Sequence, residues 1–255
     1  MVFNDPLSYI SDSAFDDSVD SLHKLQIINS NLSSIPHALA HLHKLTYLDI
    51  SFSPIQDISG LANISGLTYL GLKNNEINED SDLEISMSRL KGTLEELNLN
   101  NNDLTTLPDL SDFFKLETIY LAYNNISTES QSDLLPNSLT KLVLGENSLD
   151  SIPNSVKNLT KIQTVYIGGN RITTFDNWEL PSSLLELDLS YNLIQVVTNV
   201  SFVNQVSRLT SLDLSGNPLS VLASDAFSQL QQMTYLDLSS TSLQRLPLAV
   251  SPCKR

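Results

Sequence analysis

Apolar residues recur along this chain in an order that predicts one short strand in every repeat. Ten segments follow the form L-x-x-L-x-L-x-x-N-x-L, with first residues 22 to 27 positions apart, at 22, 45, 67, 94, 116, 139, 162, 184, 209 and 233. The clearest copies are Leu94–Leu104, Leu184–Ile194 and Leu209–Leu219. Motif positions 4 and 6 are two residues apart, which is the spacing of side chains on one face of a strand. Positions 3, 5, 7 and 8 are mostly polar and are expected to face solvent or to lie in the turn.

One such strand is too short to bury its own apolar face, so we expect the copies to stack in parallel around a continuous core. An amide side chain can donate and accept at once, so a column of asparagines can satisfy backbone groups where each coil leaves its strand. We interpret this column as structural rather than as a ladder of ligand-binding groups. At the ends of the array the position becomes Ser30, Ser53 and Thr241. Position 9 is Asn in seven consecutive copies: Asn75, Asn102, Asn124, Asn147, Asn170, Asn192 and Asn217.

The repeat pattern resembles the leucine-rich repeat family over nearly the whole chain. The resemblance implies an α/β repeat solenoid, a horseshoe with a concave parallel β-sheet and short helical or irregular convex segments. The subtypes are mixed. Ser34–Pro36 and Ser151–Pro153 resemble plant-like and short intracellular-like repeats, whereas Leu219–Phe227 resembles the repeats of animal surface receptors. The subtype therefore leaves the compartment open.

The repeats predict a single domain with incomplete ends. Residues 1–21 are expected to form a partial N-terminal repeat, 22–243 the ten repeats, and 244–255 a truncated C-terminal repeat or the remnant of a cap. Leu7–Phe15 is identical to Leu219–Phe227 at four of nine positions, so we expect the chain to open inside a repeat, with Val2 at a strand position. We therefore expect the chain to be a piece of a longer protein. The lack of a signal peptide in Met1–Ile10 is then uninformative.

Composition narrows the function classes. With 255 residues, 41% of them hydrophobic, the chain can bury a large core. A net charge of −15 disfavours binding to nucleic acid or to an anionic membrane surface, both of which require Lys and Arg. No run of 18 apolar residues predicts a membrane span. Charged residues make up only 17% of the chain, and by resemblance this composition favours an extracellular or cell-surface location, with the cytoplasm as the alternative.

Two further features bear on the compartment without deciding it. A chain this rich in Asn, Ser and Thr carries N-x-S/T sequons by chance as well as by selection. Cys253 is the only cysteine, either a free thiol near the end of the chain or the first cysteine of a lost cap. The candidate N-glycosylation sites, all outside the strand positions, are Asn31, Asn63, Asn125, Asn158 and Asn199.

No sequence signature of an enzyme is present, so we expect no catalytic residues and no cofactor. His37 and His41 are four apart and can share a helical face as zinc ligands do, but a solvated convex face is the favoured interpretation. The acidic stretch 76–84, followed by Arg89 and Lys91, has the charge order of a short helix. It lacks the glycine and the alternating oxygen ligands of a calcium loop.

The inner face of the predicted sheet holds the candidate binding residues. Seven of the eight tyrosines fall at positions 3, 5 or 8. Tyr47, Tyr69, Tyr235 and the aspartates of position 5 occur in strings common to such repeats and carry less weight. With strands about 4.8 Å apart, the remaining tyrosines can form one patch roughly 15 Å long, or an ordered surface without a partner. The predicted protein-binding residues are Tyr120, Tyr123, Tyr166, Tyr191, Glu186, Asp188, Asp213 and Asp237.

These features favour a non-catalytic module that binds a protein or peptide, the acid beside the tyrosines suggesting a basic partner. The preferred context is a ligand-recognition ectodomain fragment of a cell-surface receptor, which by resemblance could carry a kinase. The alternative is an intracellular scaffold of signalling enzymes. A purely structural or adhesive component is a further possibility.

Overall fold

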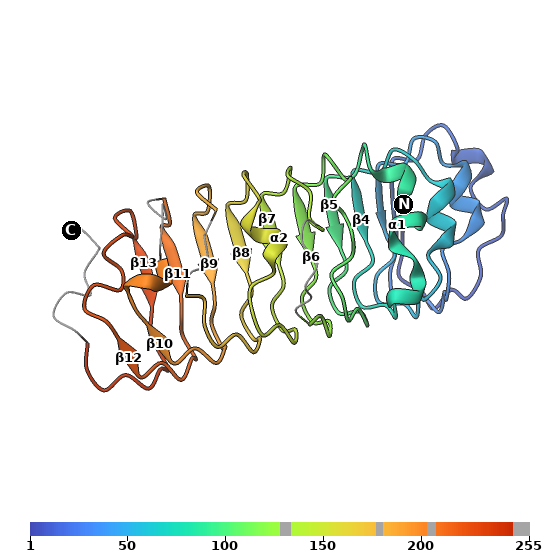
Figure 1. The fold of residues 1–255 in the computed structure, drawn as a ribbon. Helices are drawn as coiled ribbons and strands as arrows, with labels where there is room; N and C mark the ends of the chain where they lie inside the picture. The colour runs from blue at the N-terminus through green and yellow to red at the C-terminus, as the bar shows by residue number, and fades with distance from the viewer. Residues whose placement is uncertain (128–133, 177–180, 203–207, 247–255) are drawn as a thin grey trace. The chain divides into compact units, whose positions relative to one another are not determined.

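The computed structural model describes residues 1–127, 134–176, 181–202 and 208–246 (Figure 1). The chain divides into two compact units, residues 1–125 and residues 126–255. Both are built from coils that each contribute one strand to a parallel sheet. Cys253 lies outside the described residues.

The first unit contains six parallel strands that pair in chain order. The motif positions align across them without a shift, so that Leu25 pairs with Leu48, Leu48 with Leu70 and Leu70 with Leu97. The predicted strand positions are confirmed in every copy of this unit, and Val2 is paired as a strand residue with Gln26. The strands are β1 (Val2–Phe3), β2 (Lys24–Ile27), β3 (Tyr47–Asp49), β4 (Tyr69–Gly71), β5 (Glu96–Asn98) and β6 (Thr118–Tyr120).

The second unit repeats the arrangement with five strands in the order β7-β8-β9-β11-β13. A separate parallel pair, β10 (Val196–Val197) with β12 (Val221–Leu222), forms between two connecting segments. The main strands are β7 (Lys141–Val143), β8 (Thr164–Tyr166), β9 (Glu186–Asp188), β11 (Ser211–Asp213) and β13 (Tyr235–Asp237).

Short helical turns connect the strands, as the family pattern implies. The acidic stretch after Ile77 is helical, as its charge order predicted, and its first turn is capped by a reciprocal pair between Asn78 and Ser81. The 3₁₀ turns are η1 (Asp16–Ser18), η2 (His37–His41), η3 (Ser59–Asn63), η4 (Glu79–Ser81), η5 (Ser88–Leu90) and η6 (Asn199–Phe202). The α-helical turns are α1 (Leu83–Ser86) and α2 (Asn154–Lys157).

The core of each unit consists of the apolar motif positions. Positions 4 and 6 point inward because they are two residues apart on a strand, and Leu97 and Leu99 in β5 and after it are fully buried. In the second unit Phe202 is also fully buried, and its ring meets those of Phe175 and Phe227 at centroid distances of 5.2 and 5.8 Å. Phe227, at the end of the segment Leu219–Phe227, is thus a buried aromatic residue that packs in the core beneath the connecting segments.

The asparagines of position 9 link neighbouring coils through backbone hydrogen bonds. Asn170 Oδ1 accepts from the Leu149 N–H of the preceding coil at 3.0 Å. Its Nδ2 donates to Leu144 O at 3.0 Å and to Ile167 O at 2.9 Å. Asn75, Asn102 and Asn217 make the equivalent bonds in their coils. The structural interpretation of the column is therefore supported by its contacts.

Position 8 adopts the left-handed backbone conformation in all ten copies. Asn or Gly, which tolerate a positive φ, occupy five of these positions. The other copies carry residues that are strained there, including Phe52 (φ 59°), Tyr123 (φ 58°) and Tyr191 (φ 51°). Their rings are largely exposed, at 47%, 60% and 67%. The fold therefore places three aromatic side chains at costly backbone positions and in contact with solvent.

Candidate protein interface

Acidic side chains form a row on the exposed sheet face of the second unit. Asp188, Asp213 and Asp237 are aligned in register on β9, β11 and β13, which neighbour one another. Adjacent strands lie about 4.8 Å apart, so the three carboxylates repel one another. None of the three forms an ion pair with a residue of the described ranges. The row is thus an uncompensated strip of negative charge.

The same aspartates also have a local structural role. In each, Oδ1 accepts from the backbone N–H two residues later: Ser190 at 2.8 Å, Ser215 at 2.8 Å and Ser239 at 2.7 Å. Asn98 in the first unit makes the identical bond to the N–H of Asn100 at 3.0 Å. The bond therefore requires an oxygen but not a charge.

Tyr166 and Glu186 lie together on this face. The Tyr166 hydroxyl donates to Glu186 Oε2 at 2.9 Å, and Lys141 Nζ lies 5.5 Å from the centroid of the Tyr166 ring. The hydrogen bond to Glu186 raises the pKa of Tyr166, and burial and the nearby Glu186 and Asp188 charges add to the effect. The hydroxyl remains protonated at neutral pH and holds the carboxylate in place.

Tyr235 extends the face towards β13. Its hydroxyl donates to Asp237 Oδ2 at 3.2 Å, a contact that raises the pKa of Tyr235, as do the charges of Asp213 and Asp188. The hydrogen bonds from Ser239 hold the pKa of Asp237 below its ordinary value, and the hydrogen bond from Tyr235 makes a smaller contribution in the same direction. The Tyr235 side chain is 51% exposed, although it occurs in a string that is common in such repeats.

Tyr120 and Tyr123 belong to the first unit. Tyr120 ends β6 and is half-buried, whereas Tyr123 is exposed in the turn that follows. The structure brings Tyr166 and Glu186 into contact and aligns the three aspartates in the second unit. A single patch joining all four predicted tyrosines remains a prediction.

The first unit has its own row of aromatic side chains, formed by Tyr47 and Tyr69. Because both occur in common repeat strings, the sequence alone assigned them little weight. The Tyr47 and Tyr69 rings are stacked, and Lys24 Nζ lies 3.9 Å from the Tyr47 centroid. An ideal Cβ built at Gly71 would lie 2.9 Å from both the Tyr69 hydroxyl oxygen and Asp49 Oδ1, so this glycine provides the space that these groups use. The detectable signal is the column of position 3, which reads Lys24, Tyr47, Tyr69, Glu96 across four adjacent strands.

All five sequon asparagines are exposed and lie outside the strands of the sheets. In four of them the sequon hydroxyl residue is exposed as well, but Ser201, which completes the sequon of Asn199, is fully buried and bonded to Asp176. Glycans attached at these positions would leave the sheet faces open, because none of the five asparagines lies in a strand.

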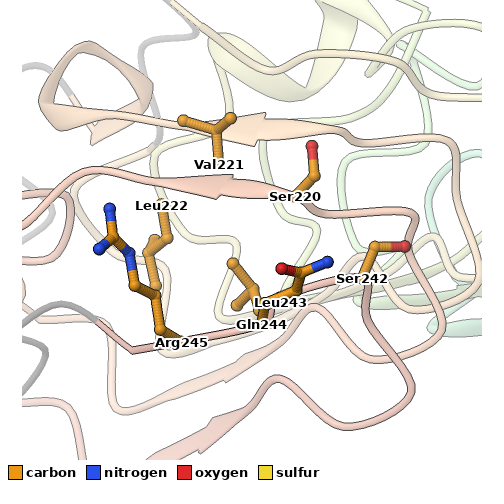
Figure 2. A pocket seen from close by; sticks show the side chains of 7 residues that line it. All are labelled: Ser220, Val221, Leu222, Ser242, Leu243, Gln244 and Arg245. Carbon is orange, nitrogen blue, oxygen red and sulfur yellow. The ribbon is translucent and has the colours of Figure 1, made fainter.

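Other kinds of site find little support in the described residues. His37 and His41 bound η2, and no group of three His, Cys, Asp or Glu gathers as metal ligands in the ranges that the structure describes. None of the described helices is long and apolar enough to span a bilayer. A hollow of about 660 Å³ in the second unit is lined by Ser220–Leu222 and Ser242–Arg245 (Figure 2), and Arg245 is the only ionisable side chain among those seven.

Comparison with known proteins relates these features to a family. Three models described as leucine-rich repeat match residues 41–62, 93–113 and 207–251. Bovine fibromodulin is 30% identical over 89% of this chain and 70% of its own length. An Arabidopsis thaliana homologue of the protein phosphatase 1 regulatory inhibitor subunit PPP1R7 is 29% identical over 76% of this chain and 56% of its own length.

A solved structure adds a similarity in three dimensions. The ectodomain of the Arabidopsis thaliana membrane receptor kinase GASSHO1/SCHENGEN3, in complex with CASPARIAN STRIP INTEGRITY FACTOR 2, superposes with a TM-score of 0.64 at 27% identity. The match covers 87% of this chain and 27% of that chain. The repeats, their parallel sheets, the family models and the fibromodulin similarity together show that this chain belongs to the leucine-rich repeat family.

Proposed function

We propose that this chain is a non-catalytic recognition module whose exposed sheet face in the second unit binds a basic segment of a protein or peptide. The observation that carries the proposal is the strip of Asp188, Asp213 and Asp237, which has tyrosines on the same face and no ion pair among the described residues. Uncompensated carboxylates favour a partner of opposite charge, and tyrosines cover area at low entropic cost.

The relatives support a binding role. The GASSHO1/SCHENGEN3 ectodomain is complexed with a factor, and the PPP1R7 homologue is named as a regulatory subunit of a phosphatase. We infer a cell-surface or extracellular context, in which the chain is part of a receptor ectodomain that could carry a kinase. Fibromodulin and the receptor kinase resemblance favour this context, together with five exposed sequon asparagines.

An intracellular scaffold of signalling enzymes is the second candidate, and the PPP1R7 similarity is the observation in its favour. The two contexts differ in one measurable property. Protein purified from its native source would change mobility on treatment with peptide-N-glycosidase if it passes through the secretory pathway. Unmodified Asn31, Asn63, Asn125 and Asn158 in that material would favour the scaffold.

The binding proposal is tested with a random 12-residue peptide phage library selected on the whole chain. We expect enrichment of sequences rich in Arg and Lys. The triple variant Asp188→Asn, Asp213→Asn, Asp237→Asn should lose at least tenfold in affinity for the enriched peptides, because it removes three charges. The oxygen that bonds the following backbone N–H is retained, as Asn98 retains it naturally.

A charge-matched control uses acids outside the strands. The variant Asp80→Asn, Asp103→Asn, Asp225→Asn removes the same charge from exposed positions of the connecting segments. Its affinity should stay within about twofold of the parent, since separated exposed charges are screened at physiological salt. Enrichment of no peptide family, or equal losses in the two triple variants, would contradict the proposed function.

A further inference from the structure

Tyr191 presents one open ring face to solvent because its other face rests on the backbone. An ideal Cβ at Gly216 would lie 2.7 Å from Cδ1 of Tyr191 and 2.9 Å from Cε1, so the ring lies directly over this glycine. The side chain is nevertheless 67% exposed. Among the described residues no lysine or arginine lies over it. An aromatic face with this exposure attracts cations.

The first unit shows how the fold fills the equivalent place. Phe52 occupies position 8 of its repeat, as Tyr191 does, and has the same left-handed backbone. Lys73, at position 7 of the following repeat, places Nζ 5.7 Å from the centroid of the Phe52 ring. The residue that corresponds to Lys73 beside Tyr191 is Ser215, which carries no charge. A cation therefore lies over the ring in one repeat and is missing in the other.

The charges around Tyr191 complete the comparison. Asp213 precedes Ser215 by two residues, and its Oδ1 accepts from the Ser215 N–H at 2.8 Å. Tyr191 N–H donates to Ser215 O at 2.8 Å, which ties both residues to the same short segment. A cation over Tyr191 would thus find an uncompensated carboxylate at the same end of β11.

We propose that an arginine side chain of the partner stacks on the open ring face of Tyr191 and pairs with Asp213. This inference rests on the proposed function. A guanidinium fits this place better than an ammonium, because it is planar and can stack on the ring while its N–H groups reach a carboxylate. The strained backbone of Tyr191 agrees with this role, since five of the ten copies have Asn or Gly, which tolerate a positive φ, at the same position.

The test uses N-acetyl-arginine amide as the probe and N-acetyl-citrulline amide, its neutral isostere, as the matched ligand. Both are titrated into the ¹⁵N-labelled chain, and the Gly216 amide shift is followed. We expect saturable shifts at Gly216 with the arginine probe. Binding of citrulline, or of arginine to Tyr191→Asn, should be at least about threefold weaker, the range of an exposed cation–π contact.

Two further variants separate the ring from its surroundings. Tyr191→Phe keeps the ring and should retain arginine binding, whereas Asp213→Asn should weaken it. Gln229→Ala, an exposed change in a connecting segment, should leave it unaltered. Equal shifts with arginine and citrulline, or unchanged arginine binding in Tyr191→Asn, would overturn the inference.

The outcome is separable from that of the proposed function. If enriched phage peptides bind in a manner that depends on the aspartate strip but is insensitive to Tyr191→Asn, the arginine site fails and the binding face stands. If the library yields no peptide at all while the arginine probe binds at Tyr191, the face is a cation site without the proposed partner class.

Discussion

Tyr47 and Tyr69 stack face to face on neighbouring strands, with ring centroids 4.1 Å apart and planes 4° from parallel. Offset or stacked aromatic pairs contribute about 0.5–1.5 kcal/mol beyond the area they bury. A double-mutant cycle with Tyr47→Ala and Tyr69→Ala should therefore give a coupling free energy of about 1 kcal/mol in urea unfolding. The same cycle on Tyr47 and the exposed Tyr9, which is not on the sheet, should give none. Additive effects of the first pair would show that the stack does not stabilise the fold.

The ionisation of this pair predicts a loss of stability at alkaline pH. Burial, followed by the Asp49 charge, raises the pKa of Tyr69 well above its ordinary value, and burial also raises the pKa of Tyr47. A phenol with a raised folded-state pKa stabilises the folded chain below the unfolded pKa of about 10 and loses that contribution as the pH rises further. The urea midpoint should fall from pH 9.5 to about 11 more steeply in the parent than in Tyr69→Phe. Identical slopes would contradict this assignment.

Removing one asparagine of the ladder should destabilise the second unit strongly. Asn170→Ala leaves the buried Leu149 N–H without its partner. It also removes one of the two asparagine donors from Leu144 O and Ile167 O, which still accept from Asn147 and Asn192. An unsatisfied buried backbone group costs about 1–3 kcal/mol, so we expect a loss of about 2 kcal/mol in the free energy of unfolding. Asn154→Ala, at an exposed position of α2, is the control and should change stability by less than about 0.5 kcal/mol.

Glu79 gives the first unit a pH-dependent clamp between two coils. Its Oε1 accepts from the backbone N–H of Thr105 at 2.5 Å, from the Thr105 hydroxyl at 2.7 Å and from the Thr106 N–H at 3.0 Å. Burial opposes ionisation, but these hydrogen bonds outweigh it and lower the pKa of Glu79. A lowered pKa stabilises the folded chain above the unfolded pKa of about 4.3 and the effect disappears as the pH falls through the folded value.

The difference in urea midpoint between the parent and Glu79→Gln should therefore be largest at pH 6–7 and shrink as the pH falls below about 4. Asp80→Asn, a neighbouring exposed carboxylate, serves as the matched control. A difference that persists unchanged at low pH would mean that the clamp acts by shape rather than by charge.

Relieving the left-handed backbone at position 8 should stabilise the chain. Tyr123→Asn replaces a strained residue with one that tolerates φ 58°, and we expect a gain of about 1 kcal/mol in the free energy of unfolding. The reverse change, Gly216→Ala, combines φ 68° with a Cβ 2.7 Å from the Tyr191 ring and should be destabilising. Thermal unfolding followed by circular dichroism measures both, and a lower Tm for Tyr123→Asn would refute the strain argument.

Much of the architecture follows from the sequence because it depends on spacing alone. Leu97 and Leu99 are buried because they are two residues apart, and Asn170 links coils because only an amide can donate and accept there. The left-handed turn at position 8 could not be inferred from Phe52, Tyr123 or Tyr191, whose residue types do not favour it. The backbone path of the coil imposes it.

The binding candidates were harder to predict, because contacts across strands depend on which side chains neighbouring coils place side by side. Tyr47 and Tyr69 look like common repeat strings, and only their alignment next to Lys24 and over Gly71 distinguishes them. Asp188 and Asp213 combine a structural hydrogen bond with unpaired charge, and a sequence string does not separate the two roles.

The direction of the asparagine bonds has an evolutionary consequence. Leu149 N–H is satisfied by Asn170 of the following coil, and Ile172 N–H in turn by Asn192. An insertion within the strand-to-turn segment would misplace the amide that the preceding coil needs, whereas an insertion in a connecting segment would not. Gains and losses of length in relatives of this chain should therefore come as complete coils or as longer convex connections, like the 27-residue spacing between the repeats that begin at Leu67 and Leu94.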